Sequence, residues 1–411
     1  MKNAEALVIG AGAVGLLAAL CLAEHDVQVH VLDAAGRHPV RGYACGLHAG
    51  TLTLLREVGL LSQALGLGHR VDRIAVYRGP ERIGTVDLGR LAGPHRYALS
   101  LRQSDLEDLL IEALEQRGVQ VSWHHEVTQL TLAEASVNVT AISRRKRAGG
   151  EAAPAREMVA RQLDTQNVDY VIGADGYHSV CRRALGIDLL GAQRPEVFAV
   201  CEFLADLSGW EHEARLVLSD DSVNAFWPLG PRLGRWTFQV QNRLHEDPSL
   251  TSLREWIRER ARWFAPNPEQ LCWGALAEFP KRVARRFGSG RIWLAGDSAH
   301  STGPLGFQSL NRGLCEAREL AAVIRDSCQG RGRRVRRFEQ FDRQQQSEWR
   351  RLFDSSTRLG SGALLASDEA ARIVPCLPAS GSDLDALLAQ LGSARVSPQP
   401  SSTMKQRHAR C

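Results

Sequence analysis

Three glycines close to the N-terminus, Gly10, Gly12 and Gly15, constrain the fold of this chain more than any other feature. They follow the apolar residues 6–9, which are typical of a strand buried on both faces, and a helical stretch comes directly after them. A second predicted strand ends at Asp33, at the separation of about 20 residues expected from the first glycine, and this carboxylate can accept hydrogen bonds from a ribose diol. The register of these features predicts a βαβ unit that binds a dinucleotide.

Each glycine has a physical role in such a unit. Gly10 permits the tight turn out of the strand, Gly12 lets the backbone approach a pyrophosphate, and Gly15 lets the helix pack closely on the strand. The helix N-terminus, where Ala13 and Val14 lie, offers free N–H groups and a positive dipole end to the phosphates. This motif by itself fits NAD as well as FAD.

Two later motifs are also predicted strands that end in a turn containing glycine and aspartate. Residues 168–176 end in Asp175 and Gly176, and residues 291–297 end in Gly296 followed by Asp297. A turn and a helix start follow the second motif, and their notable residues are Pro304, Gly306, Leu310 and Asn311.

Taken in order, the three motifs resemble those of the FAD-dependent aromatic hydroxylases, the single-component monooxygenases that share the para-hydroxybenzoate hydroxylase fold. Segments around Arg41 and Gln103 also match that family, and the resemblance covers almost the whole chain. It implies an α/β fold in which a Rossmann-type FAD-binding unit is interleaved with a mostly antiparallel β-sheet substrate unit and followed by a C-terminal helical region. It also implies bound FAD, with NAD(P)H and O₂ as co-substrates.

The resemblance assigns roles to individual residues. Asp297 would contact the ribityl chain of FAD, and the helix that begins near Gly306 would direct its N-terminal N–H groups at the N1–C2=O edge of the flavin, where reduced flavin is negative. Asp175 would shape the cleft that NAD(P)H approaches, while His300 is expected to be structural. The full set of expected FAD contacts is Gly10, Gly12, Ala13, Val14, Gly15, Asp33, Arg41, Gln103, Asp175, Gly296, Asp297, Pro304, Gly306, Leu310 and Asn311.

Two residues depart from the family pattern. Phe307 and Ser309 stand where the family usually has glycine, which lets the backbone approach the flavin closely. A Cβ atom at Ser309 is expected to be tolerated, whereas Phe307 should alter the pocket beside the flavin ring. FAD binding itself is expected to change little.

The predicted substrate unit is rich in tryptophan, since five of the nine Trp residues lie between positions 210 and 263. Such rings could line a pocket for a planar substrate, although any one of them is more often a core residue. We predict that Phe226, Trp227 and Pro228 form the pocket wall together with Phe307.

The predicted division of the chain is discontinuous. The FAD-binding domain comprises residues 1–74, 96–190 and 276–330, and the substrate-binding sheet comprises residues 75–95 and 191–275. A C-terminal helical region covers residues 331–391, and the Ser- and Pro-rich residues 392–411 are predicted to be a disordered tail.

Composition excludes several classes of protein. The formal net charge is only +5 over 411 residues, and the basic runs at 144–147 and 331–337 are interpreted as solvated, so no nucleic-acid partner is expected. Nine Cys without CxxC or zinc-like spacing predict neither a disulfide framework nor a metal site and favour the cytoplasm. The apolar residues 6–23 are explained by the glycine motif, so no integral membrane segment is predicted.

The leading hypothesis is an FAD-dependent NAD(P)H monooxygenase. It would hydroxylate or epoxidise an aromatic or quinone-like small molecule through a flavin C4a-hydroperoxide, an activity that fits secondary metabolism. No catalytic side chain is predicted, because the cofactor carries the chemistry in such enzymes. The alternatives are an FAD-dependent reductase of prenyl double bonds and a non-catalytic flavin-binding protein. The sequence leaves open the substrate, the choice between NADH and NADPH, and the oligomeric state.

Overall fold

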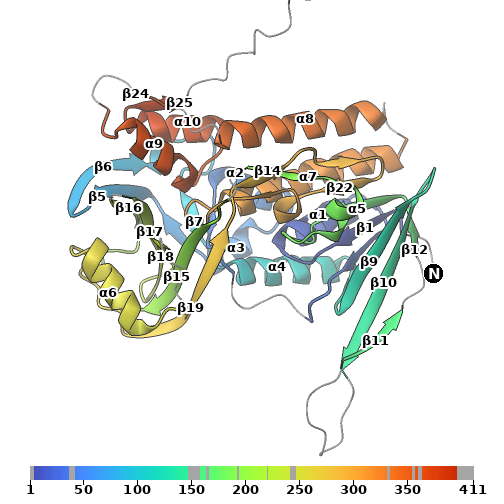
Figure 1. Ribbon diagram of the computed structural model, residues 1–411, viewed down its shortest axis with the longest axis horizontal. Coiled ribbons are helices and arrows are strands. Elements are labelled where there is room, and N and C mark those ends of the chain that lie inside the picture. The colour runs from blue at the N-terminus through green and yellow to red at the C-terminus, as the bar shows by residue number, and fades with distance from the viewer. Residues whose placement is uncertain are drawn as a thin grey trace, which may run out of the picture.

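The computed structural model describes residues 4–36, 42–146, 158–162, 166–191, 194–219, 221–240, 247–330, 334–353, 357–359 and 363–395. Arg41, Arg147 of the first basic run and residues 331–333 of the second basic run lie outside these residues. Two large sheets dominate the molecule, one near its centre and one at the left of Figure 1. Within the described residues, no helix has the length and apolar character needed to cross a membrane.

The central sheet has the strand order β21-β22-β13-β1-β2-β8 and is mainly parallel. Its strands are β1 (Ala6–Ile9), β2 (Val29–Leu32), β8 (Val121–Ser122), β13 (Tyr170–Gly173), β21 (Gly288–Ser289) and β22 (Ile292–Leu294). β1 pairs in parallel with β2 and β13, and β13 pairs in parallel with β22, so all three motif strands end at one edge of the sheet. That common edge is the reason why motifs far apart in the sequence meet.

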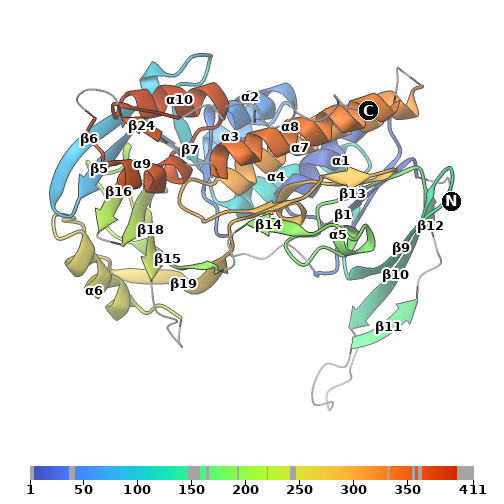
Figure 2. The ribbon, with the colours of Figure 1, turned by 45° about the horizontal axis from the view of Figure 1, so that its top comes forward.

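Helices pack beside this sheet and on one another. Helix α1 (Ala13–Ala23) contacts α4 (Gln103–Gln116) and α7 (Gln308–Cys328), and α8 (Arg334–Phe353) lies along α7, as the turned view shows (Figure 2). Helix α1 is almost entirely buried, which explains its apolar sequence without any membrane.

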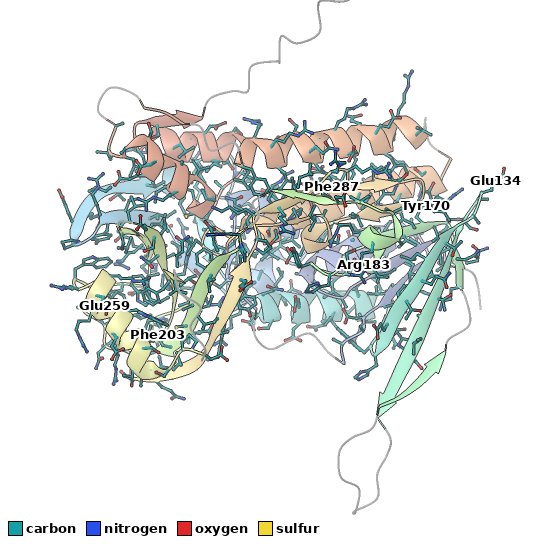
Figure 3. All side chains as sticks on the ribbon, in the orientation of Figure 1. Glu134, Tyr170, Arg183, Phe203, Glu259 and Phe287 are labelled. Atoms are coloured by element: carbon teal, nitrogen blue, oxygen red, sulfur yellow. The ribbon has the colours of Figure 1, made fainter. Side chains whose placement is uncertain are left out.

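The second sheet has seven strands in the order β19-β15-β18-β17-β16-β5-β6. These are β5 (Arg73–Arg78), β6 (Glu81–Asp87), β15 (Glu196–Leu204), β16 (Glu213–Ser219), β17 (Ser222–Pro228), β18 (Leu233–Val240) and β19 (Gln270–Phe279). All neighbours are antiparallel except β5 and β16. That parallel pair joins the early β5–β6 hairpin to the later strands. Helix α6 (Leu250–Arg260) covers one face, where Phe203 lies beside it (Figure 3).

Shorter elements connect these layers. They are β3 (Gly46–Leu47), α2 (Ala49–Glu57), α3 (Leu61–Leu67), β4 (His69–Val71), β7 (Ala98–Ser100), β9 (His125–Leu132), β10 (Val137–Lys146), β11 (Met158–Gln162), β12 (Gln166–Val168), α5 (Val180–Ala184), β14 (Leu189–Gly191), β20 (Arg282–Ala284) and β23 (His300–Ser301). Short 3₁₀ turns cover Leu88–Arg90, Gly296–Ser298 and Val374–Cys376.

The C-terminal region corrects one expectation. It contains α9 (Ser367–Ile373) and α10 (Gly381–Ala389), and also a small two-stranded sheet of β24 (Thr357–Leu359) and β25 (Ser393–Arg395). The predicted disordered tail therefore begins too early, because Leu391 is fully buried and its carbonyl accepts a hydrogen bond from the backbone N–H of Leu364, which anchors the chain before β25. Residues 396–411 lie outside the described part.

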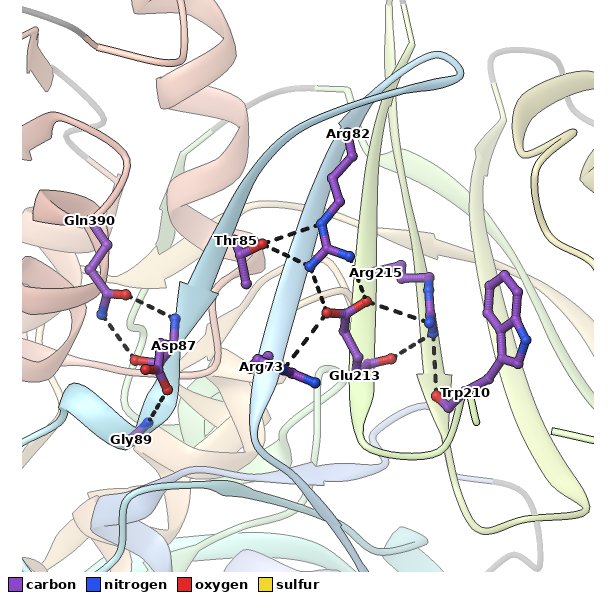
Figure 4. Close-up of polar contacts among 9 residues, drawn as sticks. All are labelled: Arg73, Arg82, Thr85, Asp87, Gly89, Trp210, Glu213, Arg215 and Gln390. Atoms are coloured by element: carbon purple, nitrogen blue, oxygen red, sulfur yellow. Dashed lines mark hydrogen bonds and ion pairs between the residues drawn. The ribbon is translucent and has the colours of Figure 1, made fainter. Parts of the chain in front are cut away.

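A buried carboxylate fixes the β5–β6 hairpin in the second sheet (Figure 4). Glu213 on β16 accepts hydrogen bonds from Arg82 on β6, with an Nη2–Oε2 distance of 2.7 Å, and Arg215 Nη2 lies 3.5 Å from its Oε1. Arg215 is 6% exposed, its guanidinium lies 4.1 Å from the centre of the Trp210 ring, and burial lowers its pKa. The hairpin is thus tied to the sheet through Glu213, a largely buried carboxylate that pairs with the half-exposed Arg82 of the hairpin and with the buried Arg215 of its own strand.

Replacing the carboxylate should destabilise the fold. We expect Glu213→Gln to lower the free energy of unfolding by about 3 kcal/mol, because it leaves the buried Arg215 without a counter-ion. Urea denaturation followed by circular dichroism measures the change. Glu269→Gln, which breaks the exposed pair with Arg232, is the matched control and should change stability by less than about 1 kcal/mol. Equal effects of the two variants would contradict the prediction.

Candidate functional site

A cavity of about 310 Å³ opens where the three motif turns meet the second sheet. Its wall is mostly backbone and small apolar side chains, with Asp297 and Tyr43 as titratable groups. The lining residues are Gly12, Ala13, Val14, Gly42, Tyr43, Ala44, Gln103, Ala174, Gly176, Phe279, Ala295, Asp297, Ser301, Thr302, Gly303, Pro304, Phe307, Ser309 and Leu310.

About half of the FAD contacts predicted from sequence line this cavity. They are Gly12, Ala13, Val14, Gln103, Asp297, Pro304 and Leu310. Other predicted contacts are absent from the cavity lining and belong to the turns and helix starts around it, namely Gly10, Gly15, Asp33, Asp175, Gly296, Gly306 and Asn311.

The glycine turn has the close contacts expected of it. Gly10 has φ +104°, and a Cβ atom there would lie 2.2 Å from the carbonyl oxygen of Ala174. A Cβ atom on Gly15 would lie 2.0 Å from the carbonyl oxygen of Gly10, so both positions exclude any larger residue. Gly12 differs, because the heavy atom nearest to a Cβ atom there would be Glu107 Oε1 at 3.8 Å, and the open space belongs to the cavity.

Two carboxylates hold the backbone around this turn. Asp33 accepts hydrogen bonds from the N–H of Ala11 (2.6 Å) and the N–H of Ala35 (2.7 Å), so it ties the end of β2 to the glycine turn. Glu107 on α4 is 1% exposed and accepts from the N–H of Ala13 (3.1 Å) at the start of α1. Gln103 Nε2 donates to the same oxygen of Glu107 at 2.8 Å. The sequence prediction included Asp33 and missed Glu107, whose signal is a charge on the apolar face of α4.

A second buried carboxylate supports the Gly296–Asp297 turn. Glu316 accepts from the N–H of Gly296 (3.1 Å) and from Trp349 Nε1 (2.7 Å), and His300 Nε2 lies 2.8 Å from its Oε2. Burial alone would raise the pKa of Glu316, but His300 and the other contacts outweigh burial and lower it. His300 is fully buried and stacks on Trp349, which fits a structural role.

Asp297 itself faces the cavity and is not covered by other side chains. Its pKa is raised because the surrounding protein removes much of its solvent, while His300 opposes the rise and Glu316 adds to it. The side chain is exposed to the cavity, and the walls of the cavity surround it and limit the water around it. A polar hydroxyl partner in the cavity would satisfy this carboxyl.

Helix α7 begins at the far end of the cavity, and Phe307 is its N-cap residue. Phe307 adopts φ +56° and ψ +28°, a left-handed conformation that favours glycine. This conformation explains why the family usually has glycine at this position. Ser309 Oγ accepts a hydrogen bond from the N–H of Thr302 at 3.1 Å. Its side chain is therefore accommodated, and the start of the helix remains intact.

Asn311 holds this helix start against the loop that leads into α2. Its Oδ1 accepts from the N–H of His48 (2.8 Å) and from Thr51 Oγ1 (2.7 Å), and its Nδ2 donates to the carbonyls of Gly46 and Phe307 (both 2.9 Å). A side chain engaged in this way is occupied within the protein. An FAD contact from Asn311 would have to come through its backbone.

Asp175 acts within its own turn. Its Oδ2 accepts from the N–H groups of Val180 (2.7 Å) and Cys181 (3.1 Å) at the start of α5, and Gly176 has φ +73°. Gly176 and Ala174 line the cavity and Asp175 does not. The predicted contribution of Asp175 to a nicotinamide cleft thus remains a proposal.

The predicted substrate wall lies on β17, and its residues Phe226 and Trp227 face opposite sides of that strand. Phe226 turns to the α6 face, where its ring centre lies 4.8 Å from that of Phe264 and 5.5 Å from that of Trp236. Trp227 turns the other way, with its ring centre 4.9 Å from that of Phe307. The prediction for Phe226 is corrected for this reason: successive side chains of a strand point to opposite faces. Pro228 is buried and does not line the cavity.

Sequence reasoning also missed a charged set that positions the loop at residues 42–44. Arg235 Nη1 donates to the carbonyls of Gly42 (3.0 Å) and Tyr43 (3.1 Å), and its Nη2 lies 2.7 Å from Glu202 Oε2. Arg102 pairs with the other oxygen of Glu202. Glu202 and Arg235 face each other across β15 and β18, so the available signal was two opposite charges within apolar strands.

Comparison with known proteins identifies the family. A family described as FAD binding domain matches residues 3–350. The chain belongs to this family. The predicted flavoprotein resemblance is therefore confirmed, and FAD is the cofactor of the FAD binding domain family.

Individual relatives agree. The 6-methylpretetramide 4-monooxygenase of Streptomyces rimosus is 27% identical over 335 residues, which cover 80% of this chain and 57% of that protein. The para-nitrophenol 4-monooxygenase of Pseudomonas sp. (strain WBC-3) is 27% identical over 329 residues, covering 77% of each chain. The chain thus spans less than two thirds of the first relative's length.

A solved structure confirms the α/β fold class. The p-nitrophenol 4-monooxygenase PnpA from Pseudomonas putida DLL-E4 superposes with a TM-score of 0.73 at 22% sequence identity, and the match covers 94% of this chain and 93% of that one.

The geometry of the cavity also fits FAD. The open space over Gly12 at the start of α1 suits a pyrophosphate, and the Asp297 carboxyl, which is exposed in the cavity, suits a sugar-alcohol chain. The start of α7, at the opposite end, suits an electron-rich ring edge. We propose that the lining residues named above hold FAD in this order.

The left-handed backbone of Phe307 leads to a stability test. Phe307→Ala should lower the free energy of unfolding by about 3 to 5 kcal/mol through the lost ring. Phe307→Gly should lower it by about 1 kcal/mol less, because glycine removes the left-handed strain. Urea denaturation of the flavin-free protein measures both.

The control is Leu314, in the right-handed interior of α7. There the order should reverse, with Leu314→Gly less stable than Leu314→Ala by about 1 kcal/mol. The same order at both positions would contradict the assigned conformation of Phe307.

The buried His48 predicts a dependence of stability on pH. Burial lowers its pKa to about 4 from 6.5, although the hydrogen bond of Nε2 to the Gly306 carbonyl opposes the shift. The unfolded chain therefore binds more protons than the folded protein between these values, and stability should fall as the pH drops from about 6.5 to about 4, by on the order of 3 kcal/mol. Unfolding midpoints of wild type and His48→Gln against pH test this; identical pH profiles would refute it.

Proposed function

We propose that this protein is an FAD-dependent monooxygenase that uses NAD(P)H and O₂ to hydroxylate or epoxidise an aromatic or quinone-like small molecule. The observation that carries the proposal is the cavity itself. At one end lies the start of α1, a place suited to bind phosphate, and at the other end lies the aromatic ring of Phe307. Bound FAD would supply the redox and oxygen chemistry in this space. The protein's part is to bind, orient and exclude water.

The cavity wall supports a cofactor-based reaction. Its described lining offers one carboxyl, on Asp297, and one phenol, on Tyr43, without a histidine or cysteine beside them. His300 and Glu316 are paired with each other behind the wall, where they hold the turn that presents Asp297. Side-chain nucleophilic catalysis has no candidate set here, whereas a redox cofactor needs none.

The names of the relatives support an aromatic substrate. One is named for 6-methylpretetramide and two for para-nitrophenol, and each name describes a 4-monooxygenase. Between these, the para-nitrophenol enzymes match this chain over a larger share of their own length. We infer a small phenolic substrate on this basis. Buried thiols at Cys21, Cys45, Cys181, Cys201 and Cys376 support the cytoplasm as the compartment.

The departures from the family pattern do not favour a non-catalytic protein. Phe307 keeps the left-handed backbone that glycine would adopt, and Ser309 is hydrogen-bonded to the N–H of Thr302. The start of α7 therefore keeps its helical geometry beside the cavity.

The test begins with the purified protein's absorbance spectrum, NADH and NADPH oxidation, and O₂ uptake with a panel of phenols and quinones. We expect flavin bands, substrate-stimulated O₂ uptake, and a product heavier by one oxygen atom. Flavin bands without stimulated uptake would favour the prenyl reductase or the non-catalytic alternative. Absence of flavin under all conditions would overturn the proposal.

Gly12→Val tests the cofactor's position. The new side chain enters open space, so the fold should survive while FAD retention falls by about tenfold or more, through a steric block at the pyrophosphate. Flavin content per polypeptide is the measurement, and circular dichroism checks the fold. Gly50→Ala, also in open space but away from the cavity, should keep its flavin. A full flavin complement in Gly12→Val would refute this placement.

A further inference from the structure

The ring of Phe307 fills the gap between the cavity and the second sheet. A Cβ atom on Gly46 would lie 2.3 Å from Cδ2 of Phe307, so the ring lies directly on the backbone of β3. The ring also packs against Trp227 on β17, at 4.9 Å between ring centres and 62° between ring planes. Phe307 is only 4% exposed, yet it lines the cavity. A glycine at this position would leave the space between the cavity and Trp227 open.

The ring has little freedom to swing aside. The backbone carbonyl of Phe307 accepts hydrogen bonds from the N–H and the Nδ2 of Asn311. A Cβ atom on the preceding Gly306 would lie 2.2 Å from the carbonyl oxygen of Pro375, so the C-terminal region abuts this turn. Gln308 Nε2 donates to the carbonyls of Leu377 (2.7 Å) and Ala379 (2.9 Å). The backbone that carries Phe307 is therefore held from both sides, while the contacts of the ring with Gly46 and Trp227 confine the ring itself.

The size of the remaining space then limits what can bind. The cavity volume of about 310 Å³ is at the low end of the range for small-molecule sites, roughly 300 to 1,000 Å³. Because its lining residues are those proposed to hold FAD, little of this volume is left for a substrate, and the Phe307 ring closes the space toward Trp227. Because close-packed aromatic walls yield little, a ligand wider than the remaining gap has to displace Phe307 against its fixed backbone.

We propose that Phe307 determines substrate size by filling the space toward Trp227, so that the site favours single-ring phenols over four-ring phenols. This inference rests on the proposed function, since it concerns the substrate of that same site. The proposed role in specificity belongs to Phe307, which stands at a position where the family usually has glycine. Trp227 is the second layer of the wall and becomes accessible only when the Phe307 ring is removed.

The experiment measures binding without turnover. Isothermal titration calorimetry of the FAD-loaded protein, without NAD(P)H and without O₂, gives dissociation constants for para-nitrophenol and for anhydrotetracycline, a four-ring phenol. Wild type should prefer the single-ring ligand by about tenfold or more. Phe307→Gly should tighten binding of the four-ring ligand by about tenfold or more and leave the one-ring ligand within about threefold. Phe307→Ala is the second enlarging variant, should Phe307→Gly lose its flavin.

Phe226→Leu is the matched control. It removes aromatic volume from the adjacent residue of the same strand, on the α6 face, so it should keep the wild-type preference. Unchanged selectivity in both Phe307 variants, or equal binding of the two ligands by wild type, overturns the inference. The two proposals fail separately: wild type that oxygenates a phenol while Phe307→Gly shows no shift refutes only the size limit. A shift without any oxygenation by wild type refutes only the monooxygenase.

Discussion

The close approach of the backbone at Gly10 and Ala174 is the constraint on which the cavity depends. It joins the turn after β1 to the turn after β13, and the N–H of Ala174 also donates to the carbonyl of Ile9 at 2.8 Å. The turn after β22 is attached in the same way, since the N–H of Ala295 donates to the carbonyl of Gly173 at 3.0 Å. Three turns that are distant in sequence therefore form one backbone surface, and any Cβ atom at Gly10 would push two of them apart.

Buried carboxylates hold the parts of the molecule that the sheet edge does not. Glu107 secures the start of α1, Glu316 secures the Gly296 turn, and Glu202 connects the second sheet to the cavity loop through Arg235. Each accepts hydrogen bonds from backbone or from paired charges, which offsets the desolvation of a buried anion. These groups set the geometry of the site without lining it, so their function is positioning.

The far end of the cavity shows a different balance. Phe307 keeps a backbone conformation in which glycine is less strained, and the packing of its ring on Gly46 and Trp227 compensates for that strain. The C-terminal region contributes to this arrangement through Pro375 and through the carbonyls that bind Gln308, although the family match ends at residue 350. The shape of the proposed substrate site thus depends on residues outside the part of the chain that defines the family.

The sequence alone determined the dinucleotide unit, the order of the three motifs and the α/β class, because glycine spacing and strand periodicity are local properties of the chain. It also identified Phe307 as the residue that departs from the pattern. Only the tertiary structure decided that Phe226 and Trp227 face opposite sides of β17, that Asn311 is engaged within the protein, and that Ser393–Arg395 form a strand. Those outcomes depend on which surfaces pack together across hundreds of residues, and hydrogen bonds such as that between Asn311 and His48 leave no local signal in the sequence.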